Sequence, residues 1–324
     1  MEKKTILVTG IGGNVGQGII RNIRSLGYPL KIVGTNNVAE SAGNHLVDQF
    51  VSVPLAYEPD YLPRIKEIIA TEQVDLIIPS TDYEMFFLAT SQDTLACKVA
   101  CGGPVSVGVY LDKYETSLFH VEHNIPFASS VLPSKVDNQF SPLIAKPRKG
   151  RGSRGIVKNI IDCSKLQDEE YLVQELVEGT EITTTAYVSF LTGKLVGVIS
   201  MERSLDNGAT TYCKVNSNFD SDIIEIAKAI MNSTDVKGSF NIQSMVDSDR
   251  KVTPFEINCR ISGTNSIRSH FGFPDVKYTV NELLYGKEAE KPAVIQGTAY
   301  RYLADVIYPH GLNTGDNSDD FKLF

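Results

Sequence analysis

The sequence predicts an α/β part followed by a longer α+β part, and two observations support this division. In residues 1–108, short apolar runs alternate with segments of helical periodicity, a pattern typical of a parallel sheet with crossover helices. After residue 108, strand-like runs follow one another closely, which favours antiparallel hairpins. A boundary is expected in Cys101–Gly108, where two glycines and a proline follow the last apolar run.

Each element of the first part has a recognisable pattern. Residues 5–10 (TILVTG) form a short apolar run and are expected to be a buried strand, not the start of a signal peptide. Apolar residues then recur at helical spacing until Gly27. Two further strands are expected at residues 31–35 and 74–80, separated by a helix at residues 61–73.

The second part begins with a helix whose cap is visible in the sequence. Asp112 is expected to cap a helix that continues to Asn124 and is stopped by Pro126. His120 and His123 lie three residues apart on this helix, and we expect them on a solvated face and not in a metal site. Strands are expected at 141–147, 155–160, 171–177, 181–190, 194–202, 238–246 and 251–261, with a helix at 221–233.

Composition excludes several classes of protein. The net charge is −8, from 31 Lys and Arg against 39 Asp and Glu, which argues against nucleic acid or an anionic membrane as the main partner. No apolar run approaches the roughly 18 residues of a membrane span. The five cysteines are scattered without a CxxC pair, so reduced thiols and a cytoplasmic location are expected.

A glycine-rich turn follows the first strand. In TGIGGNVGQG, the positions of Thr9, Gly10, Gly13 and Gly16 fit the dinucleotide fingerprint of extended short-chain reductases and epimerases. The second strand, however, ends in Asn36 instead of an acidic residue, and no tyrosine has a lysine four positions later. A Rossmann-like domain that binds no dinucleotide is therefore an equal alternative to a nicotinamide-dependent enzyme.

Two later segments are candidates for nucleotide contacts. After the strand that carries Lys146, residues 149–155 combine glycines and cations, which suits a polyphosphate clamp or, equally, an exposed basic hairpin tip. The segment YLVQELVEGTE offers a hinge at Gly179 whose backbone groups are free to bond an adenine edge. Its Glu181 is placed to accept ribose hydroxyls, although glutamates after a strand are common.

The strand FEINCRI carries the most informative pattern. Alternation places Glu256, Asn258 and Arg260 on one face and the apolar side chains on the other. If the preceding hairpin turns at residues 249–250, Gln243 lies directly across from Glu256, unless a bulge at Pro254 shifts the register. Carboxylate and amide oxygens suit a hard cation such as Mg²⁺, so we favour a metal site over a purely structural hairpin.

In this order, the motifs resemble the ATP-grasp superfamily, specifically its carbamoyl-phosphate-synthetase-like branch of stand-alone ligases. The resemblance extends from Thr5 to Gly286 and includes Asp112–Lys113, residues 124–130 (NIPFASS) and the segments described above. It implies a Rossmann-like pre-ATP-grasp domain in residues 1–108. An ATP-grasp fold of two α+β subdomains would follow in 109–298, with a mobile lid at roughly 136–180, and a C-terminal extension in 299–324.

The resemblance also implies a role for individual residues. The phosphates of ATP would contact Lys113, Lys146 and, in the glycine loop, Gly152 and Ser153. Adenine would contact the hinge residues Gln174, Glu175, Leu176 and Val177, and ribose would bind Glu181. Two Mg²⁺ or Mn²⁺ ions would be held by Gln243, Glu256 and Asn258, with Arg260 facing the transferred phosphoryl group. Cys259 replaces the proline that is usual in the family and points to the opposite face, so it should affect packing alone.

The implied activity is an ADP-forming carboxylate–amine ligase that makes an amide or peptide bond through an acyl phosphate. Its partners would be a small carboxylic acid and an amine, with a homodimer left open. We expect the acid to lie against Arg268, and less strongly Arg203, with Asp82 and Glu84 of the opposite wall near the amine. Two alternatives stay open: an NAD(P)-dependent short-chain epimerase or reductase, and an ATP-binding regulator without turnover.

Overall fold

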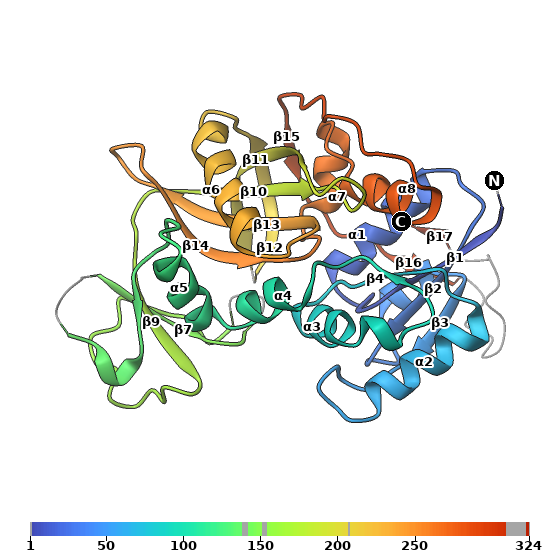
Figure 1. Ribbon diagram of the computed structural model, residues 1–324, viewed down its shortest axis with the longest axis horizontal. Helices are drawn as coiled ribbons and strands as arrows, with labels where there is room; N and C mark the ends of the chain where they lie inside the picture. Colours follow the sequence, from blue (N-terminus) through green and yellow to red (C-terminus); the bar gives the residue numbers. More distant parts are fainter. Residues whose placement is uncertain (1, 138–141, 151–153, 207, 309–321, 324) are drawn as a thin grey trace.

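The N-terminal part is built on a parallel sheet of five strands (Figure 1). The computed structural model covers residues 1–324 and describes all of them except 1, 138–141, 151–153, 207, 309–321 and 324. The strand order is β3-β2-β1-β4-β5, and every pairing is parallel. The strands are β1 Lys4–Val8, β2 Leu30–Asn36, β3 Gln49–Ser52, β4 Leu76–Ile78 and β5 Lys98–Val99. The expected parallel sheet is confirmed.

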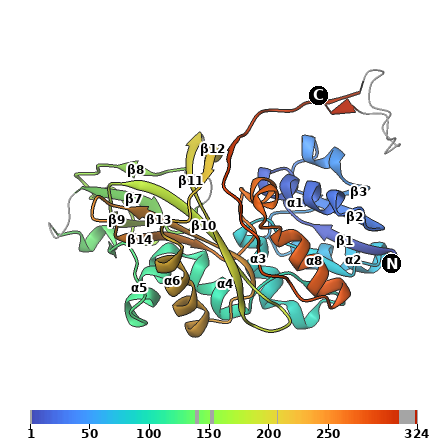
Figure 2. The same cartoon turned by 90° about the horizontal axis from the view of Figure 1, so that it is seen from above.

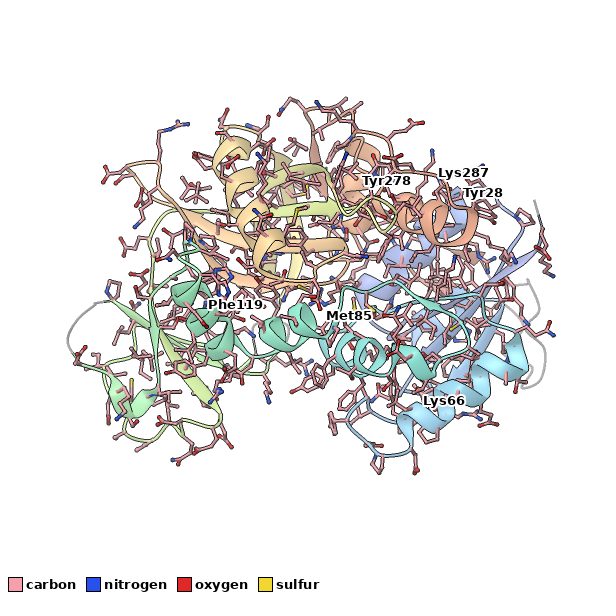
Figure 3. The ribbon with its side chains drawn as sticks, in the orientation of Figure 1. Tyr28, Lys66, Met85, Phe119, Tyr278 and Lys287 are labelled. Carbon is pink, nitrogen blue, oxygen red and sulfur yellow. The ribbon has the colours of Figure 1, made fainter. Side chains whose placement is uncertain are left out.

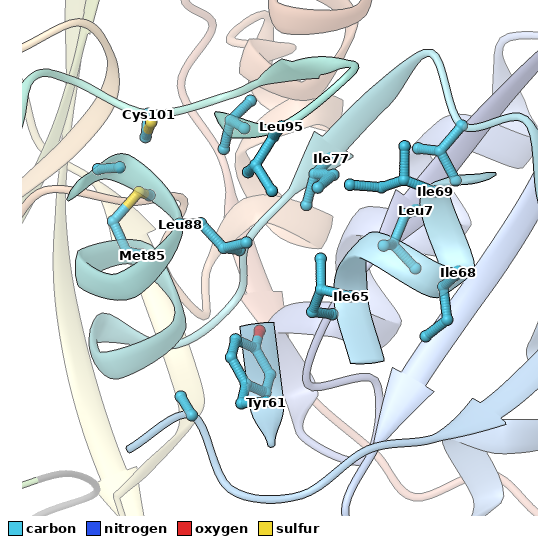
Figure 4. Close-up of a cluster of buried hydrophobic side chains, with 14 of the residues drawn as sticks. Leu7, Tyr61, Ile65, Ile68, Ile69, Ile77, Met85, Leu88, Leu95 and Cys101 are labelled. Carbon is cyan, nitrogen blue, oxygen red and sulfur yellow. The ribbon is translucent and has the colours of Figure 1, made fainter. Parts of the chain in front are cut away.

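Helices cover both faces of this sheet because its strands are apolar on both sides. Helices α1 (Asn14–Ser25) and α8 (Asp275–Tyr285) pack on the face that carries Ile6 and Ile78. Helices α2 (Tyr61–Glu72) and α3 (Asp82–Thr90) pack on the other face, around Leu7 and Ile77 (Figure 4). One helix from the second part of the sequence therefore completes the core of the first part.

The second part contains a six-stranded sheet in the order β14-β13-β10-β11-β12-β15. All its pairings are antiparallel, as the close spacing of the strands predicted. Helix α6 (Asp220–Ser233) buries its apolar side against the middle of this sheet. The strands are β10 Thr180–Val188, β11 Leu195–Asp206, β12 Ala209–Val215, β13 Gly238–Val246, β14 Val252–Asn258 and β15 Thr298–Tyr300.

A smaller antiparallel sheet has the strand order β6-β9-β7-β8. In Figure 1 it lies at the left, below β14 and next to α5. Its strands are β6 Ser130–Val131, β7 Leu143–Pro147, β8 Val157–Lys158 and β9 Tyr171–Glu175, and its own small core includes Leu143, Ala145 and Val173. The combination of a parallel sheet with separate antiparallel sheets confirms the predicted fold class.

Two helices connect the parallel sheet to the rest of the chain. Helix α4 (Pro104–Leu111) ends at Asp112, and α5 (Lys113–Glu122) begins directly after it. Asp112 caps α5 by accepting a hydrogen bond from the Tyr114 N–H at 3.0 Å, as predicted. The expectation for His120 is wrong, because its side chain is fully buried beside Tyr110. Burial lowers the pKa of His120 to about 4.

The segment after β15 crosses from the six-stranded sheet to the parallel sheet (Figure 2). Tyr308 is the last residue of this segment before the range 309–321. Its hydroxyl lies 2.7 Å from His45 Nδ1 in the helical turn η1 (Ala42–Leu46). A second link joins the two parts where Tyr28, after α1, donates to Asn281 of α8 at 3.1 Å (Figure 3). The remaining elements are α7 Asn265–Arg268, η2 Gln92–Thr94, η3 Pro133–Lys135, η4 Ser269–Phe271, β16 Val306–Ile307 and β17 Lys322–Leu323.

Within the described ranges, no helix is long and apolar enough to pass through a membrane.

Candidate active site

The hairpin of β13 and β14 brings the predicted metal-binding side chains together. Gln243 pairs with Glu256, and Asn241 pairs with Asn258. The Gln243 amide nitrogen donates to Asn258 Oδ1 at 3.1 Å, and the Asn258 amide nitrogen donates to Glu256 Oε1 at 3.2 Å. The three predicted side chains therefore form one connected polar row, and Cys259 is buried on the opposite side, as expected.

The register at this row depends on a bulge. Near the turn, Val246 pairs with Val252 and Ser244 with Pro254, but the next pair is Gln243 with Glu256. Phe255 is thus the extra residue of a β-bulge. The bulge lies next to Pro254, where the ladder already lacks a hydrogen bond because proline has no backbone N–H. The predicted pairing of Gln243 with Glu256 is confirmed. Near the turn, however, the observed pairs are shifted by one residue from the predicted register.

Two lysines from different elements reach this row. Lys113, the first residue of α5, places its Nζ 3.9 Å from Glu256 Oε1. Lys146 on β7 donates to Gln174 Oε1 of β9 at 2.6 Å, and its Nζ lies 4.6 Å from the centre of the Phe255 ring. The bulged Phe255 thus contacts the smaller sheet, and the two antiparallel sheets face each other across the two lysines.

Burial and neighbouring charges set the protonation of this cluster. Lys146 is only 5% exposed, and burial lowers its pKa to about 8, although the Glu256 carboxylate opposes that shift. Burial acts to raise the pKa of Glu256, but Lys113 and Lys146 outweigh it and hold that pKa below its ordinary value. At neutral pH Glu256 is therefore ionised, and Lys146 is mostly in its cationic form.

Arg203 on β11 extends the row toward the predicted ribose-binding residue. Its Nη2 lies 2.6 Å from Glu181 Oε1, and it also donates to the Oε1 of Gln243. The sequence predicts that Arg203 contacts the acid. In the structure, Arg203 instead contacts Glu181 and Gln243, the predicted ribose-binding and metal-binding residues. The sequence offered no signal for this pairing, because it depends on the register of β10 between β11 and β13.

The parallel sheet contributes one carboxylate to the site. Arg260, just after β14, donates to Asp82 Oδ2 at 2.8 Å, and Asp82 begins α3 beyond the carboxyl end of β4. The expectation that this wall faces the site is therefore met by Asp82. Glu84 differs, because it is buried and accepts a hydrogen bond from Thr81 Oγ1 at 2.7 Å at the helix start. Its proposed contact with an amine is wrong.

The assignment of Arg268 to the acid is also wrong. Its side chain is fully buried, and its Nη2 lies 2.5 Å from Asp275 Oδ2. Its Nη1 donates to Ser262 and Thr264 hydroxyls at 2.9 Å each. Since the carboxylate and two hydroxyls already bind this guanidinium, Arg268 anchors the loop after β14 and does not face a ligand.

The predicted hinge residues lie at the end of β9 and directly after it. The Leu176 N–H donates to Pro142 O at 2.9 Å, and the Glu175 carboxylate accepts from the Ser129 N–H at 2.9 Å. Gln174 is buried, and its side chain positions Lys146. Adenine contacts of Gln174, Glu175, Leu176 and Val177 stay a prediction. Gly152 and Ser153 lie outside the described residues.

Close packing explains two of the glycines after β1, Gly12 and Gly16. A Cβ at Gly16 would lie 2.8 Å from Gly10 O, and one at Gly12 would lie 2.6 Å from the Asn36 amide. Asn36 is itself buried and donates to Asn44 Oδ1 at 3.1 Å. The position where an acidic residue would bind a dinucleotide ribose is thus occupied by the protein's own amides, which weakens the dinucleotide alternative.

The site residues fit a divalent cation only together with a ligand that brings more negative charge. Gln243, Glu256 and Asn258 supply oxygen atoms, which Mg²⁺ prefers. No group of three or more His, Cys, Asp or Glu side chains suited to a metal occurs among the described residues. One carboxylate with two amides is a set that leaves room for nucleotide phosphates.

Comparisons with known proteins agree with this arrangement. Residues 167–306 match the family described as "ATP-grasp in the biosynthetic pathway with Ter operon", and residues 6–100 match the PylC-like N-terminal domain. A search of curated proteins gave no significant match. Residues 167–306 therefore match an ATP-grasp family, which agrees with the resemblance that the order of the motifs predicted.

Solved structures share most of this fold at low sequence identity. The ADP complex of N5-carboxyaminoimidazole synthetase from Staphylococcus aureus is 13% identical, with a TM-score of 0.70 over 90% of this chain and 80% of that one. A biotin carboxylase complex with an ATP analogue from Campylobacter jejuni is also 13% identical, with a TM-score of 0.69 over 91% and 74%. The L-amino acid ligase from Bacillus licheniformis is 14% identical, with a TM-score of 0.68 over 87% and 74%.

Proposed function

We propose that this protein is an ADP-forming carboxylate–amine ligase that makes an amide or peptide bond through an acyl phosphate. The observation that carries the proposal is the row formed by Gln243, Asn258 and Glu256, with Lys113 and Lys146 at its end. The match of residues 167–306 to an ATP-grasp family supports it, as does the similarity of the fold to a synthetase, a carboxylase and a ligase.

The charges of the site suit a nucleoside triphosphate. Among the described residues, the cations of the site include Lys113, Lys146, Arg203 and Arg260, and the carboxylates include Glu181, Glu256 and Asp82. An excess of positive charge in a partly buried site attracts a polyphosphate and disfavours a free cation. We therefore infer that Mg²⁺ or Mn²⁺ enters with ATP, and that free metal binds weakly.

The residues of the row divide the work of phosphoryl transfer. Gln243, Glu256 and Asn258 would hold the metal ions, which neutralise the phosphate oxygens of ATP and keep them aligned. Lys146 would neutralise charge near the α-phosphate, and Arg260 would stabilise charge on the group in transfer. The acid oxygen attacks the γ-phosphorus, ADP leaves, and the amine then attacks the acyl carbon and releases phosphate.

The acid is proposed to lie against the loop of residues 261–264, beside Arg260. Arg301 replaces Arg268 as the candidate contact for the acid, because its Nη2 donates to Gly263 O of this loop at 2.7 Å. Its Nη1 is buried and has no hydrogen-bond partner within the described part of the chain. A guanidinium with an unpaired N–H is suited to a carboxylate that the substrate brings. Asp82 remains the candidate for the amine.

The test is ADP release in the presence of Mg²⁺ and pools of acids and amines. A pair of substrates should accelerate ADP release together, and mass spectrometry should detect an amide formed from both. With ¹⁸O in the acid carboxylate, one label should appear in the released phosphate, because the acyl phosphate transfers that oxygen. ADP release without label transfer would contradict the acyl-phosphate step, and absence of ATP binding would contradict the proposed function itself.

A further inference from the structure

Arg148 and Asp112 form an ion pair between the two elements that carry the lysines of the site. Arg148 follows β7 two residues after Lys146, and Asp112 directly precedes Lys113. The Arg148 Nε lies 3.1 Å from both Asp112 oxygens, and its Nη2 lies 3.0 Å from Asp112 Oδ2. Asp112 is 5% exposed. A shielded, two-pronged pair of this kind fixes both distance and orientation.

Additional contacts hold the pair in place from both sides. Arg148 Nη1 donates to Asp168 O at 3.0 Å, and the Arg148 N–H donates to Glu170 O at 2.8 Å, just before β9. The Lys113 N–H donates to Arg148 O at 3.0 Å, and Lys113 Nζ donates to Gly150 O at 3.3 Å. The helix that starts with Lys113 and the strand that carries Lys146 are thus joined at this single arginine.

We propose that Asp112 and Arg148 are positioning residues that set the spacing of Lys113 and Lys146 for the phosphates of ATP. The inference rests on the proposed function, because it requires both lysines to contact phosphate. Neither residue needs to touch the nucleotide. The pair acts by keeping α5 and β7 in one arrangement, so that both ammonium groups meet the phosphates without further movement.

The structure allows the ion pair to be separated from the helix cap. Asp112 accepts the Tyr114 N–H as well as the Arg148 guanidinium. Asp112→Asn keeps a good N-cap side chain and removes the charge. Arg148→Lys keeps the charge but loses the two-pronged geometry, and Arg148→Gln loses both. Arg24→Gln is the matched control, since it breaks the 2.6 Å ion pair with Asp48 in the parallel-sheet part of the chain.

The experiment measures Kd by calorimetry for two probes, the ATP analogue AMPPNP with Mg²⁺ and adenosine, which lacks phosphates. Asp112→Asn and Arg148→Gln should each weaken AMPPNP binding about tenfold, as expected for a displaced charge contact, and leave adenosine binding unchanged. Arg148→Lys should fall between wild type and Arg148→Gln. The double variant should lose no more than either single variant, because the two residues act as one unit.

Three results would overturn the inference. They are unchanged AMPPNP binding in both single variants, an equal loss for AMPPNP and adenosine, and a loss in the double variant that equals the sum of the single losses. A melting temperature matching that of Arg24→Gln would show that the variants are folded. Failure of the wild-type protein to bind AMPPNP would instead refute the proposed function, so the two failures are distinguishable.

Discussion

The turn after β1 and the hairpin of β13 and β14 differ in how well their sequence patterns indicate function. The turn has the glycine spacing of a dinucleotide site. In the structure, however, the lack of a side chain at Gly12 and Gly16 lets the backbone pack closely against itself and against Asn36. The hairpin has no short signature of small residues, yet it places Gln243, Glu256 and Asn258 in one hydrogen-bonded row. Two lysines from other elements then reach this row.

The difference shows which kind of pattern carries chemical information. Glycine spacing indicates only that the backbone turns tightly or lies very close to another group. That group can be another part of the protein as readily as a phosphate. A strand face with an acid, an amide and an arginine reports which side chains share one surface. Four predictions test this contrast, beginning with the largest expected effect.

Glu256→Gln should reduce kcat by at least about a thousandfold, the scale of several kcal/mol expected for a metal site in phosphoryl transfer. The change keeps the size of the side chain but removes the one carboxylate of the row. ADP release with the identified substrates measures it. Glu202→Gln is the matched control, since Glu202 is another carboxylate of the same sheet and accepts from an asparagine amide at 2.5 Å.

Retention of more than about a tenth of wild-type kcat in the Glu256→Gln protein would show that this carboxylate does not hold the metal ions. A similar loss in Glu202→Gln would show instead that carboxylates of the sheet act through the fold.

Lys146 should give the reaction a pH dependence on the alkaline side. Burial lowers its pKa to about 8, so the cationic form that binds phosphate dominates below that pH and is lost above it. The value of kcat/KM for ATP, which reports the free enzyme, should fall about tenfold per pH unit above pH 8. In Lys146→Arg the decline should move to higher pH, because arginine stays charged. An unchanged profile in Lys146→Arg would assign the decline to another group.

Gly16→Ala should destabilise the protein, whereas Gly13→Ala should be close to neutral. An added Cβ at Gly16 would lie 2.8 Å from both Gly10 O and Ile11 Cα, but at Gly13 the nearest atom is 3.8 Å away. Overpacking of this kind costs about 1–3 kcal/mol. Urea unfolding should show the loss for Gly16→Ala alone, with AMPPNP affinity unchanged in both. A loss of nucleotide affinity in Gly13→Ala would restore a phosphate-binding role to this turn.

Local patterns were sufficient for most of the fold. Helical spacing at Ile19, Ile20 and Ile23 and short apolar strands predicted the parallel sheet, and close strand spacing predicted the antiparallel ones. Two strands of the parallel sheet, β3 and β5, were not anticipated, because they are only four and two residues long in the structure. The packing of α8 against the first part also depends on contacts between distant segments, which a local pattern does not encode.

The site was predictable where a single strand carried it and not where separate elements meet. The face of β14 followed from alternation, whereas the predicted pairing with Gln243 holds because the bulge at Phe255 offsets a turn that lies one residue from the predicted register. Arg268 was misplaced because closeness in sequence to β14 does not tell whether a side chain faces a ligand or the core. Arg203, Arg148 and Arg301 gained their importance from neighbours far along the chain, such as Gln243, Asp112 and Gly263.

The smallest expected effect is an absence of binding. NAD⁺ or NADH titrated to about 1 mM should give no saturable signal, which means that the binding free energy is weaker than roughly −4 kcal/mol. The reason is that the chain itself fills the position beside the glycine turn where the ribose would bind. Asn36 is 6% exposed, it bonds Asn44, and it lies against Gly12. Gly43 in the turn η1 approaches Ile11 O so closely that a Cβ there would clash with it. A ribose and pyrophosphate would have to displace both contacts, whereas AMPPNP, the positive control in the same titration, is expected to bind beside the row of Gln243, Asn258 and Glu256. Micromolar NAD⁺ binding without AMPPNP binding would reverse the comparison and make the glycine turn the functional site.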